Sequence, residues 1–92
     1  MNQFCDAIRD RRIITFRYKG TVRTAEPHLV GYNSDGDLTL SAWQLSGGSG
    51  QGFRDYHVKK VSGLTISKQS FVGPRPDYNP VDKTLPRIIC RL

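Results

Sequence analysis

The feature that most constrains the fold is a series of short runs of β-branched, aromatic and apolar residues that alternate with turn-forming residues. The runs lie at 13–18, 21–25, 37–43, 54–61 and 64–67. Between them stand turn signals: Lys19-Gly20, Asn33 to Gly36 and Ser62-Gly63. Runs of this length and composition, bounded by Gly, Asn, Asp and Ser, are typical of strands joined by tight turns. The sequence therefore predicts a mainly β domain with five short strands.

A single helix is expected before the strands. Asn2 is suited to cap its start, and Phe4, Ala7 and Ile8 recur at helical spacing within residues 2–12. The apolar stripe is narrow, so the helix has to pack on an open end of the sheet. One helix and five short strands predict a small, partly open barrel of the SH3 or Sm type, with an OB-like barrel as the alternative.

The composition changes after residue 70. Four of the five prolines fall in residues 71–92. This density predicts a Pro-rich, extended C-terminal tail (71–92) behind a folded domain (1–70), without a further regular element. The tail ends in an apolar stretch, 85–92, that needs cover. It either packs back on the barrel or adds to a second subunit.

Charge and cysteine content limit the classes of function. The formal net charge of +6 favours polyanionic partners, although many basic proteins bind none. Cys5 and Cys90 lie near opposite ends with no CxxC pair and no His at metal spacing, which predicts no zinc site. We expect reduced thiols in a cytoplasmic protein, with a disulfide between the two ends as the alternative. The N-terminal residues do not resemble a signal peptide, and no apolar run approaches the ~18 residues of a membrane span, so no membrane contact is expected.

The candidate site centres on the run Arg54-Asp-Tyr-His-Val-Lys-Lys-Val61. In a strand, Arg54, Tyr56 and Lys60 share one face, which then carries two cations and an aromatic ring. Such a face is typical of contacts with anions or nucleic acid. Tyr56 could equally be a core ring. On the face of the strand that carries Arg54 the neighbours are Tyr56 and Lys60 and include no carboxylate, so an anion would complete its charge.

Three further residues join this candidate site. Arg23 lies on the preceding hairpin; it pairs with Glu26 only if the chain bends at Pro27. Trp43 is on the polar side of its strand and either covers the N-terminal helix or offers a stacking platform. Tyr18 is added by the same argument from strand faces.

The glycine-rich segment and the two histidines would suggest catalysis, but neither has the neighbouring residues that catalysis requires. The segment from Ser46 to Gly52 holds four glycines, but the Lys, the Ser or Thr and the helix of a phosphate-binding P-loop are missing, which predicts a mobile hairpin connection. His28 and His57 have no nucleophile beside them and are expected at the surface. We expect neither enzymatic activity nor a cofactor.

These residues resemble the WYL domain, an Sm-like or SH3-like β-barrel module of bacterial and phage regulators. The similarity covers roughly residues 4–71. It lies in an Ala-Ile helix before Ile13-x-x-Phe-x-Tyr18, in Arg23-x-x-Glu-Pro27, in Gly36-x-Leu-x-Leu-x-Ala42 and in Arg54-x-Tyr-x-Val-x-Lys-Val61.

The chain departs from the family pattern in three ways. The tripeptide that names the family is Leu38-Thr39-Leu40 here, and Lys60 stands where Arg is usual. We also expect no winged helix-turn-helix before the barrel, although regulators of this family commonly have one.

The resemblance implies non-catalytic sensing of a ligand or nucleic acid in transcriptional or defence regulation. The family's site positions correspond to Arg23, Arg54, Tyr56 and Lys60. The expected partner is single-stranded nucleic acid or a nucleotide, together with a protein that carries a DNA-binding domain or a second copy of the chain. The alternative is a protein–protein or homodimerisation module that uses the tail, with an incidental basic face.

Overall fold

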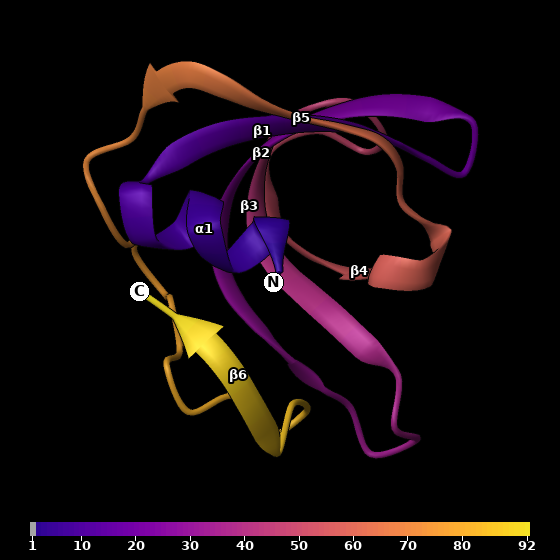
Figure 1. Ribbon diagram of the computed structural model, residues 1–92, viewed down its shortest axis with the longest axis vertical. Coiled ribbons are helices and arrows are strands. Elements are labelled where there is room, and N and C mark those ends of the chain that lie inside the picture. Colours follow the sequence, from indigo (N-terminus) through magenta and orange to yellow (C-terminus); the bar gives the residue numbers. More distant parts are fainter. Residues whose placement is uncertain (1) are drawn as a thin grey trace.

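The fold is a six-stranded antiparallel sheet with one short helix, seen in a computed structural model that describes residues 2–92 (Figure 1). The elements in order are α1 (Gln3–Asp10), β1 (Arg12–Tyr18), β2 (Thr21–Tyr32), β3 (Leu38–Ser46), β4 (Gly52–His57), the 3-10 helix η1 (Val58–Lys60), β5 (Ser62–Ser70) and β6 (Arg87–Arg91). The strand order is β4-β3-β2-β1-β5, and β6 pairs with β2. The prediction of a mainly β domain behind an N-terminal helix is confirmed. The sheet does not close on itself.

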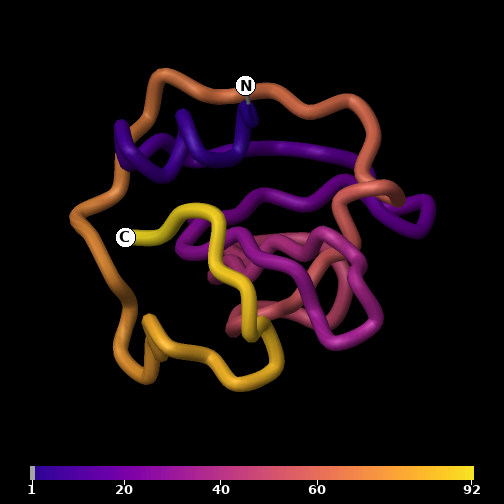
Figure 2. Tube along the Cα trace, turned by 60° about the horizontal axis from the view of Figure 1, so that its bottom comes forward, coloured from indigo at the N-terminus to yellow at the C-terminus, as the bar shows by residue number. Residues whose placement is uncertain are grey.

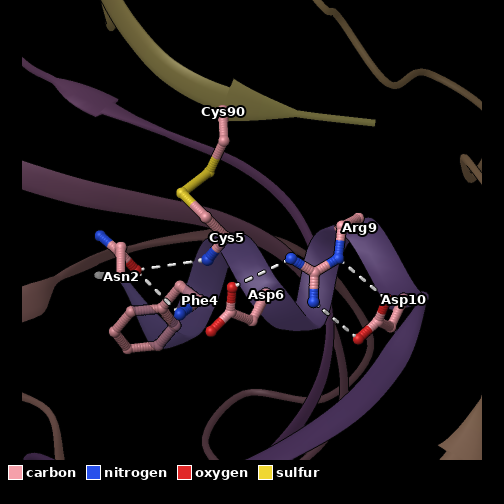
Figure 3. A network of polar contacts seen from close by, with 7 residues as sticks. All are labelled: Asn2, Phe4, Cys5, Asp6, Arg9, Asp10 and Cys90. Atoms are coloured by element: carbon pink, nitrogen blue, oxygen red, sulfur yellow. Dashed lines mark hydrogen bonds and ion pairs between the residues drawn. A yellow bond between two sulfur atoms is a disulfide. The ribbon is translucent and has the colours of Figure 1, made fainter.

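Helix α1 forms where its capping residue predicts it. The Asn2 side-chain oxygen accepts hydrogen bonds from the backbone N–H of Phe4 at 2.8 Å and of Cys5 at 3.3 Å (Figure 3). The helix ends at Asp10, and the next residue, Arg11, caps it in a left-handed conformation with φ 52°. Its buried residues, Phe4, Ala7 and Ile8, belong to the same core as the strands.

Strand β2 organises the sheet. It is 12 residues long and pairs with β1 at its start, with β3 over most of its length, and with β6 at its end. Pro27 lies inside this strand. β2 continues through it to Tyr32, and the register with β3 shifts between Pro27 and Leu29. Such an irregularity accommodates a residue that has no N–H to donate.

The core lies between α1 and the inward face of the strands. Its largest strand residues are Ile14, Phe16, Leu40 and Tyr56, all at most 1 % exposed. Within residues 2–92 no helix has the length and apolar character that a membrane crossing requires.

The run around Arg54 is not one continuous strand. Strand β4 ends at His57, and Val58, Lys59 and Lys60 form η1 before β5 begins. The expectation that Arg54, Tyr56 and Lys60 share a strand face is therefore wrong for Lys60, because the period of two ends before it is reached.

The tail packs back on its own chain. Figure 2 shows it leaving β5, passing around the outside of the molecule and returning to the sheet. Residues Arg87–Arg91 form β6 against the end of β2, and the Leu92 N–H donates to the His28 carbonyl at 2.9 Å. The tail thus contains a regular element that its proline content did not predict.

A disulfide joins the two ends of the chain. Cys5 on α1 and Cys90 on β6 are bonded, with their Cα atoms 5.8 Å apart (Figure 3). The expectation of reduced thiols is wrong for this structure, because the return of the tail places the two cysteines side by side.

Candidate anion-binding site

The site is built around the side chain of Gln44, which is fully buried near the end of β3. Its amide oxygen accepts hydrogen bonds from the Tyr56 hydroxyl at 2.6 Å and from Arg23 Nη1 at 2.9 Å. Its amide nitrogen donates to the carbonyls of Gly47 at 2.6 Å and Gly50 at 2.7 Å. One amide therefore fixes two of the predicted site residues and the glycine-rich loop together.

Gln44 was not identified as a site residue from the sequence. Leu38, Leu40 and Ala42 alternate on the apolar face of their strand, and Gln44 continues that spacing. A polar amide on an apolar face has to be hydrogen-bonded when buried. A polar residue at an apolar position of the alternation therefore indicated that Gln44 has a specific role.

Arg23 on β2 keeps most of its hydrogen-bonding capacity free. Besides Gln44 it donates from Nη2 to the Tyr18 carbonyl at 3.3 Å, and its guanidinium lies 5.6 Å from the Tyr18 ring centre. Its Nε is buried without a partner. Five N–H donors thus serve two hydrogen bonds. Glu26, the acid considered as its partner, pairs with Arg75 instead.

Arg54 on β4 is held by neutral groups alone. Nη1 donates to the Phe53 carbonyl at 2.8 Å, and Nη2 donates to the Ser49 hydroxyl at 3.0 Å and the Gly50 carbonyl at 3.5 Å. Among residues 2–92, neither Arg23 nor Arg54 has a carboxylate within 4.0 Å. Neither guanidinium group therefore forms an ion pair within the part of the chain that the structure describes.

The glycine-rich loop packs directly against both guanidinium groups. A Cβ on Gly48, where φ is +54°, would lie 2.6 Å from Arg23 Nη1. A Cβ on Gly52, where φ is +146°, would lie 2.7 Å from Arg54 Nη1. Any other residue would push the arginines aside. The loop expected to be a mobile connection is instead fastened by Gln44 and Arg54.

The two tyrosines of the predicted site belong to the core. Tyr56 is 1 % exposed and Tyr18 is 5 % exposed, and their rings meet edge to face at 5.1 Å. Burial raises the pKa of Tyr56 despite the nearby Arg23 and Arg54, so its hydroxyl stays protonated and donates to Gln44. Tyr18 accepts from the His57 N–H at 3.1 Å. Packed in this way, Tyr18 and Tyr56 line the site from within the core, and neither ring face is free to stack on a ligand.

Trp43 and Lys60 do not join the arginines. Trp43 follows the opposite face of β3, where it meets Phe53 edge to face at 5.3 Å and has the Arg75 guanidinium 5.2 Å from its ring centre. Lys60 is exposed on η1, outside the face of β4 that carries Arg54. Of the six predicted residues, the structure brings together Arg23, Arg54, Tyr18 and Tyr56.

A second buried polar cluster on the other side of the sheet is fully satisfied. His28 is completely buried, against the expectation of a surface position. Its Nδ1 lies 2.7 Å from the Glu26 carbonyl, and its Nε2 accepts from the Arg75 N–H at 3.0 Å. Burial lowers the pKa of His28 and keeps the ring neutral. Arg75 also donates to the Glu26 carboxylate, from Nε to Oε1 at 2.7 Å and from Nη2 to Oε2 at 2.9 Å. This cluster therefore anchors the tail.

A cavity that Arg54 helps to line carries three carboxylates. It encloses about 450 Å³ and is lined by Phe53, Arg54 and Tyr78 together with Asp55, Asp77 and Asp82. Burial, with Asp82 close by, raises the pKa of Asp55. Within residues 2–92 no group of three or more His, Cys, Asp or Glu side chains is arranged to hold a metal. Three carboxylates around one arginine make this cavity unfavourable for an anion.

A scan against protein-family models and searches of curated proteins and of solved structures gave no significant match.

Proposed function

We propose that the chain is a non-enzymatic regulatory module that binds a negatively charged ligand, single-stranded nucleic acid or a nucleotide, at Arg23 and Arg54. The observation that carries the proposal is the pair of guanidinium groups held by neutral acceptors around Gln44 without a carboxylate within 4.0 Å. A half-buried guanidinium gains most from an anion that its own chain does not supply. The net charge of +6 draws such ligands toward the molecule.

The finer assignment of fold and setting is part of the same proposal. The open strand order, with β2 shared by three neighbours, supports a small, partly open SH3-like or Sm-like barrel. On that basis we interpret the chain as a WYL-like domain that acts in the cytoplasm in transcriptional or defence regulation. It would act through a partner that carries a DNA-binding domain.

A homodimer that exchanges its tails is less well supported. The tail already pairs with β2 of its own chain and is bonded to α1 of its own chain. Both links would have to be broken before a second subunit could use the tail.

Salt dependence tests the proposal. We would titrate the protein with a labelled single-stranded oligonucleotide and with a labelled nucleotide between about 50 and 200 mM salt. For two phosphate contacts with the oligonucleotide, the logarithm of the association constant should fall with the logarithm of salt concentration with a slope of roughly −1.4. Arg54→Ala should reduce the slope by roughly half. The matched control, Lys83→Ala, removes one exposed charge from the tail and should keep the slope. A flat response for both ligands would contradict anion binding.

A further inference from the structure

We infer that the cavity between β4 and the tail binds a small organic cation, an ammonium or guanidinium group carried on a short apolar stem. This inference goes beyond the proposed function, because the ligand has the opposite charge. Three features of the cavity support it: its carboxylates have no cationic partner, two aromatic residues line it, and its lining includes a buried hydroxyl group.

The carboxylates around the cavity belong to the acidic residues that the chain leaves unpaired. The chain has eight acidic residues, against fourteen lysines and arginines. Within residues 2–92, the acids that form no ion pair are Asp35, Asp55, Asp77 and Asp82. Asp35 lies in the turn before β3, and the other three line the cavity. Unpaired negative charge is therefore concentrated at this one place.

Arg54 does not form the missing ion pair. It also lines the cavity, but no carboxylate of the described chain lies within 4.0 Å of its guanidinium group. Its hydrogen bonds to Ser49 and Gly50 hold it to the glycine-rich loop instead. Three carboxylates and one guanidinium leave the lining with excess negative charge, which a bound cation would reduce.

The spacing of the carboxylates favours an organic cation over a metal ion. Asp55 lies on β4, and Asp77 and Asp82 come from the tail. In the described part of the chain these carboxylates are not gathered closely enough to hold one metal. A cavity of about 450 Å³ has the size of a small-molecule site. Carboxylates spread around such a cavity suit a cation that has several N–H donors.

The aromatic residues suit both the stem and the charge of such a ligand. The rings of Phe53 and Tyr78 are stacked, with their centres 6.4 Å apart and an angle of 27° between their planes. Each ring also meets the completely buried His28 ring at 5.1 Å, so the core holds both rings in place. Aromatic faces attract cations that lie within about 6 Å of the ring centre. Their carbon surface covers an apolar stem.

The buried hydroxyl group belongs to Ser41 on β3. Ser41 is 9 % exposed, lines the cavity and stands opposite Asp55 in the register of β3 and β4. Burial raises the pKa of Asp55 and Asp82 adds to this effect, whereas the Ser41 hydroxyl acts against it and favours the charged carboxylate. The cavity thus combines a buried polar group, aromatic rings and carboxylates, which distinguishes it from an acidic patch on the surface.

Calorimetric titration of the full chain at about 150 mM salt tests the inference. The Debye length is then about 8 Å, so distant positive charges of the protein act weakly on a ligand in the cavity. The probes are n-pentylamine, agmatine and N-acetyl-lysine methylamide, with 1-pentanol as the neutral analogue. We expect saturable binding of the cations and none of 1-pentanol. Tighter binding of the free amines would indicate a small metabolite, and tighter binding of the lysine derivative would indicate a side chain of a partner protein; either result supports the inference.

Variants locate the binding to the cavity. Asp55→Asn and Asp77→Asn keep the shape of the side chain and remove one charge, so each should weaken agmatine binding about threefold to tenfold. Asn tolerates the left-handed conformation of Asp77, where φ is 72°. The matched control, Asp35→Asn, removes an unpaired carboxylate outside the cavity and should leave the affinity unchanged.

Arg54 separates this inference from the proposed function. Arg54→Ala, with Arg54→Gln as a second form in case the first is poorly folded, removes a positive charge from the lining. It should strengthen agmatine binding about threefold to tenfold while it weakens anion binding. Absence of binding by every cation, equal binding of 1-pentanol and n-pentylamine, or equal losses in Asp35→Asn and Asp77→Asn would overturn the inference. Each of these results would leave the proposed anion binding untouched.

Discussion

Gln44 and His28 are two completely buried polar side chains on neighbouring strands, and each fastens a distant segment to the sheet. Gln44 holds the glycine-rich loop, and His28 with Glu26 holds the tail through Arg75. Beside His28, Arg75 is paired with the Glu26 carboxylate. Around Gln44 the two arginines have only amide, hydroxyl and carbonyl oxygens.

The contrast shows how an arginine beside an aromatic ring can be interpreted. Arg75 over Trp43 and Arg23 over Tyr18 lie at similar distances from their rings, 5.2 and 5.6 Å. The ring therefore does not separate a structural arginine from a ligand-binding one. The presence or absence of an internal carboxylate does, because a compensated charge has little left to offer a ligand. Four changes test this difference.

The largest expected effect is on the free energy of unfolding, when the disulfide that holds the tail is removed. Replacing both Cys5 and Cys90 by Ser removes a link between residues 85 positions apart. The free energy of unfolding should fall by about 2–5 kcal/mol, because the unfolded chain regains its freedom. Chemical denaturation measures this free energy. Wild-type protein in reductant serves as the control, because the cytoplasm is a reducing compartment and the reduced protein is relevant there. Anion affinity should be unchanged, and a loss of affinity would show that the two regions depend on each other.

Gln44→Leu tests the other buried side chain. The change leaves the Tyr56 hydroxyl and two loop carbonyls without their partner, which should cost about 2–3 kcal/mol of unfolding free energy and also weaken anion binding. Tyr56→Phe is the matched control: it removes one donor and should cost only about 1 kcal/mol. Equal effects of the two changes would mean that the loop is not held by Gln44.

Exchanging each arginine for alanine tests the comparison itself. Arg75→Ala leaves the Glu26 carboxylate, which is 5 % exposed, without its partner and should cost about 2 kcal/mol of stability, with anion affinity unchanged. Arg54→Ala removes the hydrogen bonds to Ser49 and Gly50, should cost only about 1 kcal/mol of stability, and should reduce affinity. Thermal unfolding and titration of both variants measure the two effects. A loss of affinity in Arg75→Ala together with a loss of stability alone in Arg54→Ala would show that Arg75 binds the anion and Arg54 is structural.

Lowering the pH should reduce the free energy of unfolding through His28, by less than the substitutions above. The pKa of His28 is lowered in the folded protein, so below pH ~6.5 the unfolded chain binds a proton that the folded chain does not. The free energy of unfolding should therefore decrease as the pH falls from ~6.5 toward the folded pKa, by at most about 1.4 kcal/mol per pH unit. Denaturation between pH ~7.5 and ~5.5 measures this in a His57→Gln background, where His28 is the remaining imidazole. A flat profile would contradict the buried neutral ring.

Local signals predicted much of the fold. The cap at Asn2, the hairpin turn at Lys19-Gly20 and the turn that ends at Gly36 all appear where residue type demands them. The end of β4 at His57 did not follow from alternation, because apolar spacing alone does not distinguish a strand from a short 3-10 turn. Strand β6 and the disulfide depend on contacts between residues far apart in sequence, which period and propensity do not encode.

The candidate site was predicted in part. Spacing along the strand placed Arg54 and Tyr56 on one face, but it could not tell that this face points into the core at Tyr56. Trp43 was assigned to the site because its strand neighbours are polar, whereas the returning tail covers that side with Arg75. The role of Gln44 depends on the path of the loop, which the glycines leave open.

The central claim is that Arg23 and Arg54, which have no carboxylate partner within the described chain, bind an anion, whereas Arg75, which is paired with Glu26, does not. The most direct test follows the side-chain Nε–H signals of the three arginines by nitrogen-15 NMR during titration with pyrophosphate. The account predicts saturable shifts of the Arg23 and Arg54 signals at one common affinity, with the Arg75 signal unmoved. Shifts of Arg75 alone, or no shift of Arg23 and Arg54 at any concentration, would contradict it.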